Sequence, residues 1–154
     1  MQTKPELREI KPISFIFFRT ETYLEQLPNF VPVTQDLFKE ACMYSLQVTG
    51  PVHWHYIGCD GNPSTPFTLE IALPVADTLT DYDGSFHFKR TGSFRCASLK
   101  HEGDWMSMRE AYEKLNAFIA ERELKPLPLM REVYVNTDFR NPDANETEIQ
   151  IGVE

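Results

Sequence analysis

The sequence predicts an α+β protein built from two copies of one unit, with a groove on the axis between them. Residues 54–60 align with residues 132–138, seventy-eight positions further along the chain. Fourteen residues after the tyrosine of each segment comes a Glu-Ile pair, which begins at Glu70 in the first copy and at Glu148 in the second. A repeat at a fixed spacing indicates that one structural unit occurs twice.

The first unit reads as strand, helix, strand, strand. Residues 13–20 are rich in β-branched and aromatic side chains, which are typical of a strand. Apolar residues recur on one helical stripe from Thr34 to about Val48 and predict a helix there. Strands are predicted at 52–59 and 67–75, joined by a loop rich in Asp, Asn, Gly and Pro. We expect the first dozen residues to be irregular, because they are mostly polar and contain two prolines.

The second unit repeats this order. Residues 93–100 read as a strand, and a capping box formed by Ser107 and Glu110 predicts the start of a helix. Two strands, at 131–137 and 147–153, close the unit. Because each unit ends in a loop-linked strand pair, the sheet should be mainly antiparallel, with both helices packed on it. The buried stripe of the second helix is expected to consist of Met108, Ala111, Tyr112, Leu115, Phe118 and Ile119.

The composition bounds the class of protein. Hydrophobic residues make up 42% and charged residues 25% of the 154 residues, as in an ordinary globular domain that needs no metal or disulfide. The net charge of −8 argues against nucleic-acid binding, which depends on neutralising phosphates. The sequence contains no apolar run near the ~20 residues of a membrane span and no signal-peptide pattern. Cys42, Cys59 and Cys96 have no paired spacing, so we expect a cytoplasmic protein with reduced thiols.

Four short motifs resemble the GyrI-like small-molecule-binding domain, which also occurs as the effector-binding domain of AraC- and MerR-type multidrug regulators. They are TGSFRCA at 91–97, HEGDW at 101–105, REVY at 131–134 and ETEIQIGV at 146–153. Each motif alone is modest, but their order and spacing, together with the repeat, cover nearly the whole chain. The closing strand ends in Ile-Gly-Val where the family has Ile-Pro-Val, and the first half is less typical of the family.

The resemblance implies one GyrI-like domain over residues 1–154. It would contain a βαββ repeat at about 12–76 and a second at about 85–154, related by a pseudo-twofold axis with a central cleft. No DNA-binding domain is expected, since the first unit begins near residue 12. Family members bind bulky, flat, often cationic compounds beside an acidic residue that maps onto Glu132. The expected partner is therefore a small hydrophobic or cationic ligand, and neither nucleic acid nor a membrane.

Two other functions stay open at this point. Some stand-alone family members hydrolyse strained, cyclopropane-bearing natural products. In that case Glu132 would act as a general base, with Tyr134 or Tyr56 as the proton donor. Other members resemble DNA gyrase inhibitors, which would make the chain a protein-interaction module with a protein partner.

Glu132 is the residue on which the ligand-binding hypothesis depends. Alternation along its strand predicts that Val133 and Val135 face the helices, whereas Glu132 and Tyr134 share the opposite face. A strand glutamate is usually exposed, and the resemblance reverses that interpretation. A carboxylate in an apolar groove would lose hydration, and a cationic ligand would relieve that cost.

Aromatic residues are predicted to surround this carboxylate. Trp54 and Tyr56 occupy the positions in the first unit that match Glu132 and Tyr134 in the second, so the twofold should bring the four together. Aromatic faces there can stack a flat ligand or a cation. Their alternative role is in the core. Trp105, just before the second helix, is expected either at the mouth of the groove or packed on the helix.

Other notable residues are assigned structural roles. Glu70 and Glu148 are related by the repeat and are expected to hold a turn or to pair with arginine. His53 and His55 have the spacing of two metal ligands on one strand, but no third ligand has a telling spacing, so we expect neither a metal nor a cofactor. Alternation leaves open which of the first-strand phenylalanines line the groove: Phe15, Phe17 and Phe18.

Overall fold

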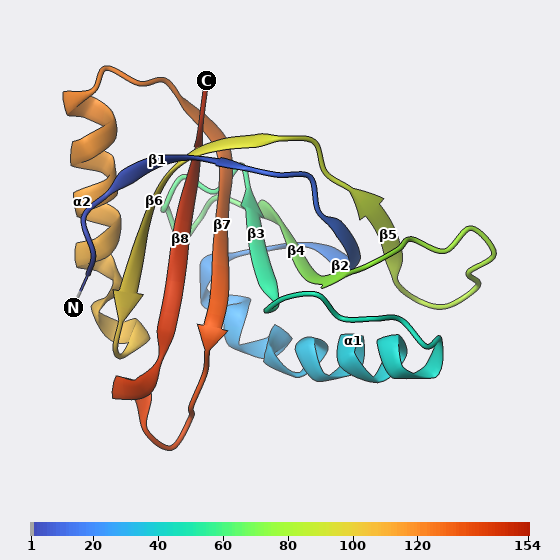
Figure 1. The fold of residues 1–154 in the computed structure, drawn as a ribbon. Helices are drawn as coiled ribbons and strands as arrows, with labels where there is room; N and C mark the ends of the chain where they lie inside the picture. Colours follow the sequence, from blue (N-terminus) through green and yellow to red (C-terminus); the bar gives the residue numbers. More distant parts are fainter. Residues whose placement is uncertain (1) are drawn as a thin grey trace.

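The computed structural model describes residues 2–154 as one eight-stranded sheet with two main α-helices (Figure 1). All strand pairs in the sheet are antiparallel. The order across the sheet is β1-β6-β8-β7-β3-β4-β2-β5. The predicted α+β fold class is therefore confirmed. Within the described residues, no helix combines the length and apolar character that crossing a lipid bilayer requires.

The elements follow the predicted order, with an additional strand near the start of the chain and a short strand between the two units. Three short 3-10 turns, η1 (Leu24–Phe30), η2 (Trp105–Ser107) and η3 (Pro142–Ala144), accompany the longer elements. The longer elements are β1 (Glu6–Ile10), β2 (Ser14–Thr22), α1 (Val31–Met43), β3 (His53–Ile57), β4 (Phe67–Val75), β5 (His87–Arg90), β6 (Phe94–Glu102), α2 (Met108–Glu121), β7 (Pro126–Asn136) and β8 (Glu146–Val153).

The two units meet at the centre of the sheet. One consists of β2, α1, β3 and β4, and the other of β6, α2, β7 and β8. Their strands are arranged symmetrically about the central β7–β3 pair, which lies side by side in Figure 1. In this ladder Trp54 lies directly opposite Glu132. The aligned segments of the repeat are therefore hydrogen-bonded neighbours.

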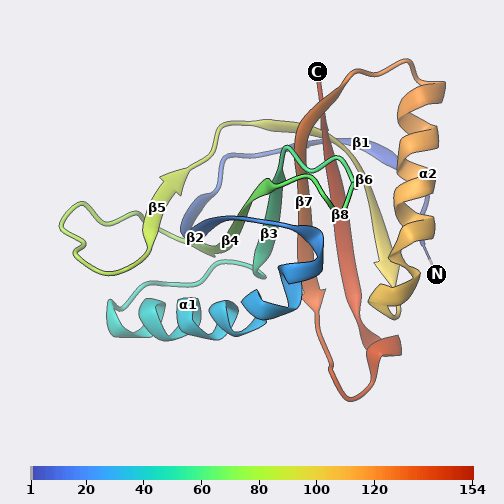
Figure 2. The ribbon, with the colours of Figure 1, turned by 180° about the vertical axis from the view of Figure 1, so that it is seen from behind.

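Both helices pack on the same face of the sheet and leave its centre uncovered. Helix α1 lies over β2 and β4, and α2 lies over β6 and β8. The main apolar core of the first unit includes Leu37 and Ala41 of α1, and that of the second includes Leu115 and Ile119 of α2. Figure 2 shows the two helices apart, on either side of β3 and β7. This gap positions the site described below.

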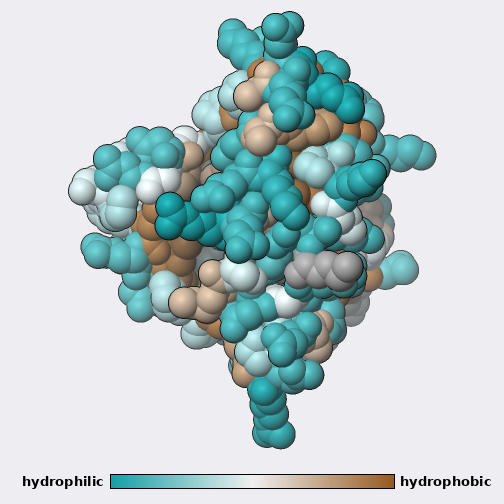
Figure 3. Space-filling view, turned by 90° about the vertical axis from the view of Figure 1, so that its left-hand side faces the viewer, coloured by the Kyte–Doolittle hydropathy of each residue, from teal (hydrophilic) through white to brown (hydrophobic). Residues whose placement is uncertain are grey.

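The amphipathic character of α2 agrees with the prediction for its buried stripe. Met108, Ala111, Leu115 and Ile119 are buried, and Tyr112 is half-buried. The opposite side of this helix carries charged residues, and the molecular face that carries α2 is mostly hydrophilic (Figure 3). A helix with one apolar stripe and one charged face packs on a sheet in this way.

The face of the sheet without helices is also buried. Three-residue links join β1 to β2 and β5 to β6, and these links are tied together by the Thr91 amide, which donates to the Ile13 carbonyl at 2.9 Å. The sheet therefore curls around this second face, which we call the far face. Phe15 and His55 are on it and are almost completely buried.

Three local predictions were wrong. The first dozen residues were expected to be irregular, but Glu6–Ile10 form β1, which pairs with β6 at one edge of the sheet. Helix α1 begins at Val31, with Pro32 in its first turn, where a missing N–H costs no hydrogen bond. It ends at Met43 rather than near Val48, because Ser45 adopts a positive φ of 54° that a helix cannot continue through.

The third error concerns the start of α2. Ser107 makes no capping hydrogen bond with its side chain, so the predicted capping box does not form. Asp104 caps the preceding 3-10 turn instead, since its side chain accepts from the Met106 amide at 3.0 Å. The Ser107 hydroxyl donates to the Asp104 carbonyl at 2.7 Å. The chain thus enters α2 through a turn that carries Trp105.

Candidate functional site: a cavity between the two units

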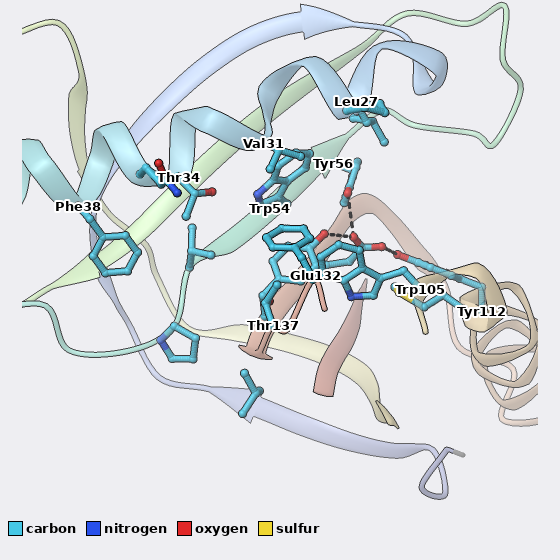
Figure 4. Close-up of a pocket in the computed structure, with 18 of the residues that line it drawn as sticks. Leu27, Val31, Thr34, Phe38, Trp54, Tyr56, Trp105, Tyr112, Glu132 and Thr137 are labelled. Carbon is cyan, nitrogen blue, oxygen red and sulfur yellow. Dashed lines mark hydrogen bonds between the residues drawn. The ribbon is translucent and has the colours of Figure 1, made fainter. Parts of the chain in front are cut away.

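A cavity of about 910 Å³ lies between α1 and α2, over the central strands (Figure 4). Its wall takes residues from both units, as the groove of the sequence prediction requires. Strands β3 and β7 supply its floor, while Leu27 and Val31 approach from the first unit and Tyr112 from α2. The five residues predicted to bind the ligand all line this cavity: Trp54, Tyr56, Trp105, Glu132 and Tyr134.

Three tyrosine hydroxyls donate hydrogen bonds to the Glu132 carboxylate. Tyr56 and Tyr134 donate to Oε1 at 2.8 and 2.5 Å, and Tyr112 donates to Oε2. Figure 4 shows Tyr56 and Tyr112 approaching the carboxylate from different sides. A carboxylate can accept about four hydrogen bonds, so these three hydroxyls leave roughly one acceptor position for another group.

Glu132 has no cationic partner within residues 2–154, although it is only 8% exposed. A buried carboxylate without a counter-charge is costly even when it is hydrogen-bonded. The three neutral hydroxyls compensate part of the lost hydration but none of the negative charge. The cavity therefore carries a concentrated negative charge at its floor.

The same burial keeps the three tyrosines protonated. Desolvation raises the pKa of Tyr56, Tyr112 and Tyr134 well above the usual value of 10, and the charge of Glu132 raises each of them further. All three phenols are therefore hydrogen-bond donors across the physiological pH range. They orient the carboxylate without neutralising it.

Aromatic rings form much of the remaining wall. Trp54 and Tyr134 meet edge to face with ring centres 6.1 Å apart, and Trp105 meets Tyr134 in the same way at 5.5 Å. The Trp105 indole N–H donates to the Thr147 hydroxyl at 3.1 Å, which fixes the orientation of this ring. Phe139 lies next to Trp105 with ring centres 5.9 Å apart. Flat aromatic surfaces beside a negative charge favour a flat or cationic group.

The predicted orientation of β7 was wrong. Glu132 and Tyr134 share a face, as expected, but it is the face that carries the helices, because Tyr112 of α2 contacts Glu132 directly. Val133 lies on the far face. The prediction assumed that the most apolar side chains face the helices. That assumption fails here because both faces of the curled sheet are buried.

Some residues that line the cavity were missed from the sequence. Tyr112 was interpreted only as part of the α2 stripe, although a buried tyrosine usually needs a hydrogen-bond partner for its hydroxyl. Val31, Phe38, Val135 and Phe139 lie around the opening, and between 40% and 70% of each side chain is exposed. Exposed apolar residues in one group often mark a binding site, but this grouping exists only in the folded chain.

The two repeat-related glutamates pair with cations, as one of the alternatives expected. Glu70 binds Lys89 and also Arg19, at 2.6 Å, and Glu148 binds Arg8 at 2.5 Å. Burial alone would raise the pKa of Glu70, but the hydrogen bonds and charges of Lys89 and Arg19 outweigh it and lower this pKa.

The histidine pair belongs to the far face. His53 Nδ1 and His55 Nε2 are 3.2 Å apart, and His55 Nδ1 is 3.4 Å from Lys89 Nζ. Burial, followed by the charge of Arg131, lowers the pKa of His53 to about 3. Among residues 2–154, no group of three or more His, Cys, Asp or Glu side chains is arranged to hold a metal ion.

The first-strand phenylalanines do not line the cavity. Phe15 and Phe17 pack with Ala72 on the far face, whereas Phe18 lies on the helix side and contacts Phe30. The side chains that alternation left undecided are therefore core residues of the two faces.

The fold and the cavity define the class of this chain: an α+β protein of two βαββ units with a carboxylate-floored cavity at their junction. No protein-family model and no curated protein sequence matches it. Solved structures do match, at identities that show the fold alone. The fold is the one expected from the GyrI-like resemblance.

Three of these structures cover nearly the whole chain. The EcmrR C-terminal domain has a TM-score of 0.78 and 19% identity, over 98% of this chain and 97% of that one. SAV2435 bound to tetraphenylphosphonium has a TM-score of 0.68 and 13% identity, over 99% and 94%. A hydrolase from Listeria innocua has a TM-score of 0.70 and 15% identity, over 98% and 92%. In the EcmrR–DNA complex, this chain spans 57% of the EcmrR chain.

Proposed function

We propose that this protein binds hydrophobic, cationic small molecules in the cavity between its two units. Glu132 supplies the negative charge, and Trp54, Tyr56, Trp105 and Tyr134 supply stacking surface. The observation that carries the proposal is a buried carboxylate held only by neutral hydroxyls at the floor of an aromatic cavity. A bound cation would provide the counter-charge that the described part of the chain lacks.

The size of the cavity supports this class of ligand. Drug-sized ligands occupy cavities of about 300 to 1,000 Å³ that are mostly apolar, with a few polar groups that fix orientation. The cavity of about 910 Å³ is at the upper end of this range. The structural neighbour SAV2435 was solved with tetraphenylphosphonium, which is a bulky lipophilic cation. The proposal extends that class of ligand to this protein.

A pair of ions with the same shape and opposite charge tests the proposal. Tetraphenylphosphonium should raise the melting temperature, because a ligand that binds only the folded state stabilises it. Tetraphenylborate, which is nearly isosteric but anionic, should not. Calorimetric titration should show that Glu132→Gln weakens binding of the cation at least about tenfold, or roughly 1.4 kcal/mol.

The matched control is Glu121→Gln, which removes one negative charge from an exposed position at the end of α2. It should bind the cation as the wild-type protein does. Equal stabilisation by both ions, or unchanged binding in Glu132→Gln, would show that the carboxylate is not the anchor.

A second function is favoured by the hydrolase among the structural neighbours and by the contacts of Glu132. A carboxylate can act as a general base on water, and one of its tyrosines can donate a proton to the leaving group. This function would act on a strained, electrophilic ligand in the same cavity. Time-dependent loss of a cyclopropane-bearing substrate, abolished in Glu132→Gln, would establish it. Binding of such a compound without turnover would reject it.

The proposal treats residues 1–154 as one binding domain in the cytoplasm, with repeats near 12–76 and 85–154. Cys42, Cys59 and Cys96 are all free thiols, which is compatible with a reducing compartment. The partner in this proposal is the small molecule itself, and direct contact with nucleic acid is no part of it.

A further inference from the structure

A second cavity, of about 430 Å³, shares part of its wall with the first. Leu27, Tyr56, Tyr112 and Glu132 line both cavities. The Tyr56 and Tyr112 hydroxyls both donate to the Glu132 carboxylate, so these three side chains form a common wall. The carboxylate is thus accessible from two directions. A ligand group that replaces one tyrosine as its hydrogen-bond partner would connect the two spaces.

The outer part of the second cavity carries its own negative charge. Its wall is completed by Cys59 and Asp60, which follow β3, and by Asn116 of α2. Asp60 is exposed, and one of its carboxylate oxygens accepts from the Asn62 amide at 2.9 Å. No lysine, arginine or histidine is among the residues that line this cavity. Asp60 therefore faces the second cavity without a competing positive charge there.

The first cavity differs at its opening. Arg109 of α2 is among its lining residues, is largely exposed and pairs with Glu113 at 3.4 Å. A second positive group on a ligand would meet this ion pair at that end, whereas at the Asp60 end it would meet a carboxylate with no lysine, arginine or histidine in the cavity wall. The charges around the two cavities therefore favour one direction for a long ligand.

We infer that the two cavities form one elongated site whose preferred ligands carry two positive groups. The first group lies beside Glu132, with its ring system in the larger cavity. A linker follows the smaller cavity, and the second group lies beside Asp60. This inference rests on the proposed function for its first anchor, and it adds Asp60 as a residue that determines specificity.

A series of ligands with matched ends provides the test. Bis-quinolinium compounds joined by four to twelve methylene groups are compared with mono-quinolinium compounds that carry the same alkyl chains. Either end of a bis-quinolinium can occupy the Glu132 site, which alone gives a statistical factor of two. Calorimetric titration should show that the best bis-quinolinium binds about four- to tenfold tighter than its partner, because an exposed ion pair contributes a further factor of about two to five. This advantage should have an optimum in linker length.

The variant Asp60→Asn tests the second anchor. An asparagine carbonyl can still accept from the Asn62 amide, so the turn is retained. The advantage of the bis-quinolinium should fall to the statistical factor of two in Asp60→Asn and persist in full in Asp77→Asn, which changes an exposed aspartate outside both cavities. Mono-quinolinium binding should be the same in all three proteins.

The cysteines provide an independent readout of occupancy. Cys59 lines the second cavity and is half-buried, whereas Cys42 is exposed and lies outside both cavities. The bis-quinolinium should slow alkylation of Cys59 by iodoacetamide and leave Cys42 unaffected. An advantage of no more than twofold in the wild-type protein, an advantage of more than twofold that survives Asp60→Asn, or an unprotected Cys59 would each overturn the inference. If any of these outcomes were found while mono-quinolinium binding still depended on Glu132, the inference would fall and the proposed function would stand.

Discussion

Two glutamates on opposite faces of one sheet are buried to a similar degree but stabilised in different ways. Glu70, on the far face, is 2% exposed and pairs with Lys89 and Arg19. Glu132, on the helix face, is 8% exposed and accepts only from tyrosine hydroxyls. The repeat-related Glu148 resembles Glu70, because it pairs with Arg8.

This difference distinguishes carboxylates with a structural role from a carboxylate that is available to a ligand. A carboxylate whose counter-charge comes from the protein has little to gain from a ligand, and its removal leaves unpaired cations behind. A carboxylate held only by neutral donors has no counter-charge from the protein, and a cationic ligand can supply one. We therefore expect the two residues to respond oppositely to substitution, in stability and in binding.

The largest effect on stability is expected from Glu70→Ala. Loss of this carboxylate leaves Lys89 partly buried without its partner, and we expect the free energy of unfolding to fall by about 3 kcal/mol. Urea denaturation measures this change. Glu21→Ala, at an exposed position of β2, should change it by less than about 0.5 kcal/mol. Tetraphenylphosphonium affinity, measured where both variants are folded, should stay at the wild-type value.

The stability of the far face should also be sensitive to acid. The pKa of His53 is about 3 in the folded protein and about 6.5 when unfolded, so only the unfolded state gains a proton between these values. Its contribution to stability is complete above pH 6.5 and is lost as the pH falls toward 3. At pH 5 this loss amounts to about 2 kcal/mol.

Urea denaturation at pH 7.5 and at pH 5 measures this dependence on His53. In His53→Gln the decrease in unfolding free energy between the two conditions should be smaller by about 2 kcal/mol. His87→Gln, at an exposed position of β5, should leave the decrease at its wild-type size. An unchanged decrease in His53→Gln would mean that another group causes the acid sensitivity.

A smaller effect on stability is expected from Glu132→Gln. Removing an unpaired buried charge relieves a cost, while one or more tyrosine hydroxyls lose an acceptor. These effects oppose each other, so the free energy of unfolding should stay within about 1 kcal/mol of wild type. The variant should nevertheless bind the lipophilic cation poorly. A loss of stability as large as that of Glu70→Ala would remove the contrast between the two faces.

The smaller effect on binding of the two cavity variants is expected from Tyr134→Phe, which removes one of the three hydroxyls from Glu132. Stability should fall by about 1 kcal/mol, the usual value of one hydrogen bond. Cation affinity should rise by a few-fold, because the carboxylate of the free protein is then less well stabilised. Tyr82→Phe is the control, because the Tyr82 hydroxyl donates to Glu40 outside the cavity. This variant should lower stability and leave cation affinity unchanged. Weaker binding in Tyr134→Phe would show that the tyrosines contact the ligand more than they compete with it.

The sequence predicted the mainly antiparallel sheet, and the residues of its repeat are those of the two strands that pair at the centre. Trp54 and Glu132 align in the repeat, and in the structure they are cross-strand neighbours. Edge strand β1 was missed because three of the five residues in its short segment, Glu6–Ile10, are charged, and the segment has little apolar character of its own. Its stability comes from pairing with β6, which no local pattern reports.

The position of Glu132 could be predicted, but its surroundings could not. Alternation along β7 correctly predicted that Glu132 and Tyr134 lie on the same face of the sheet. It did not predict which face, because residues on both sides of β7 are buried. Tyr112 reaches the carboxylate from a different element, twenty residues away in sequence. Its part in the cluster follows from how α2 packs on the sheet. Sequence patterns report periodicity within an element better than contacts between elements.

The chain has two tryptophans, Trp54 and Trp105, and both line the larger cavity. Their indole rings therefore lie in the wall of the site and nowhere else in the molecule. Intrinsic fluorescence of the unlabelled protein should report the arrival of a molecule in this cavity by quenching or by a shift of the emission maximum. A titration followed at these wavelengths would identify compounds that enter the site without any chemical tag.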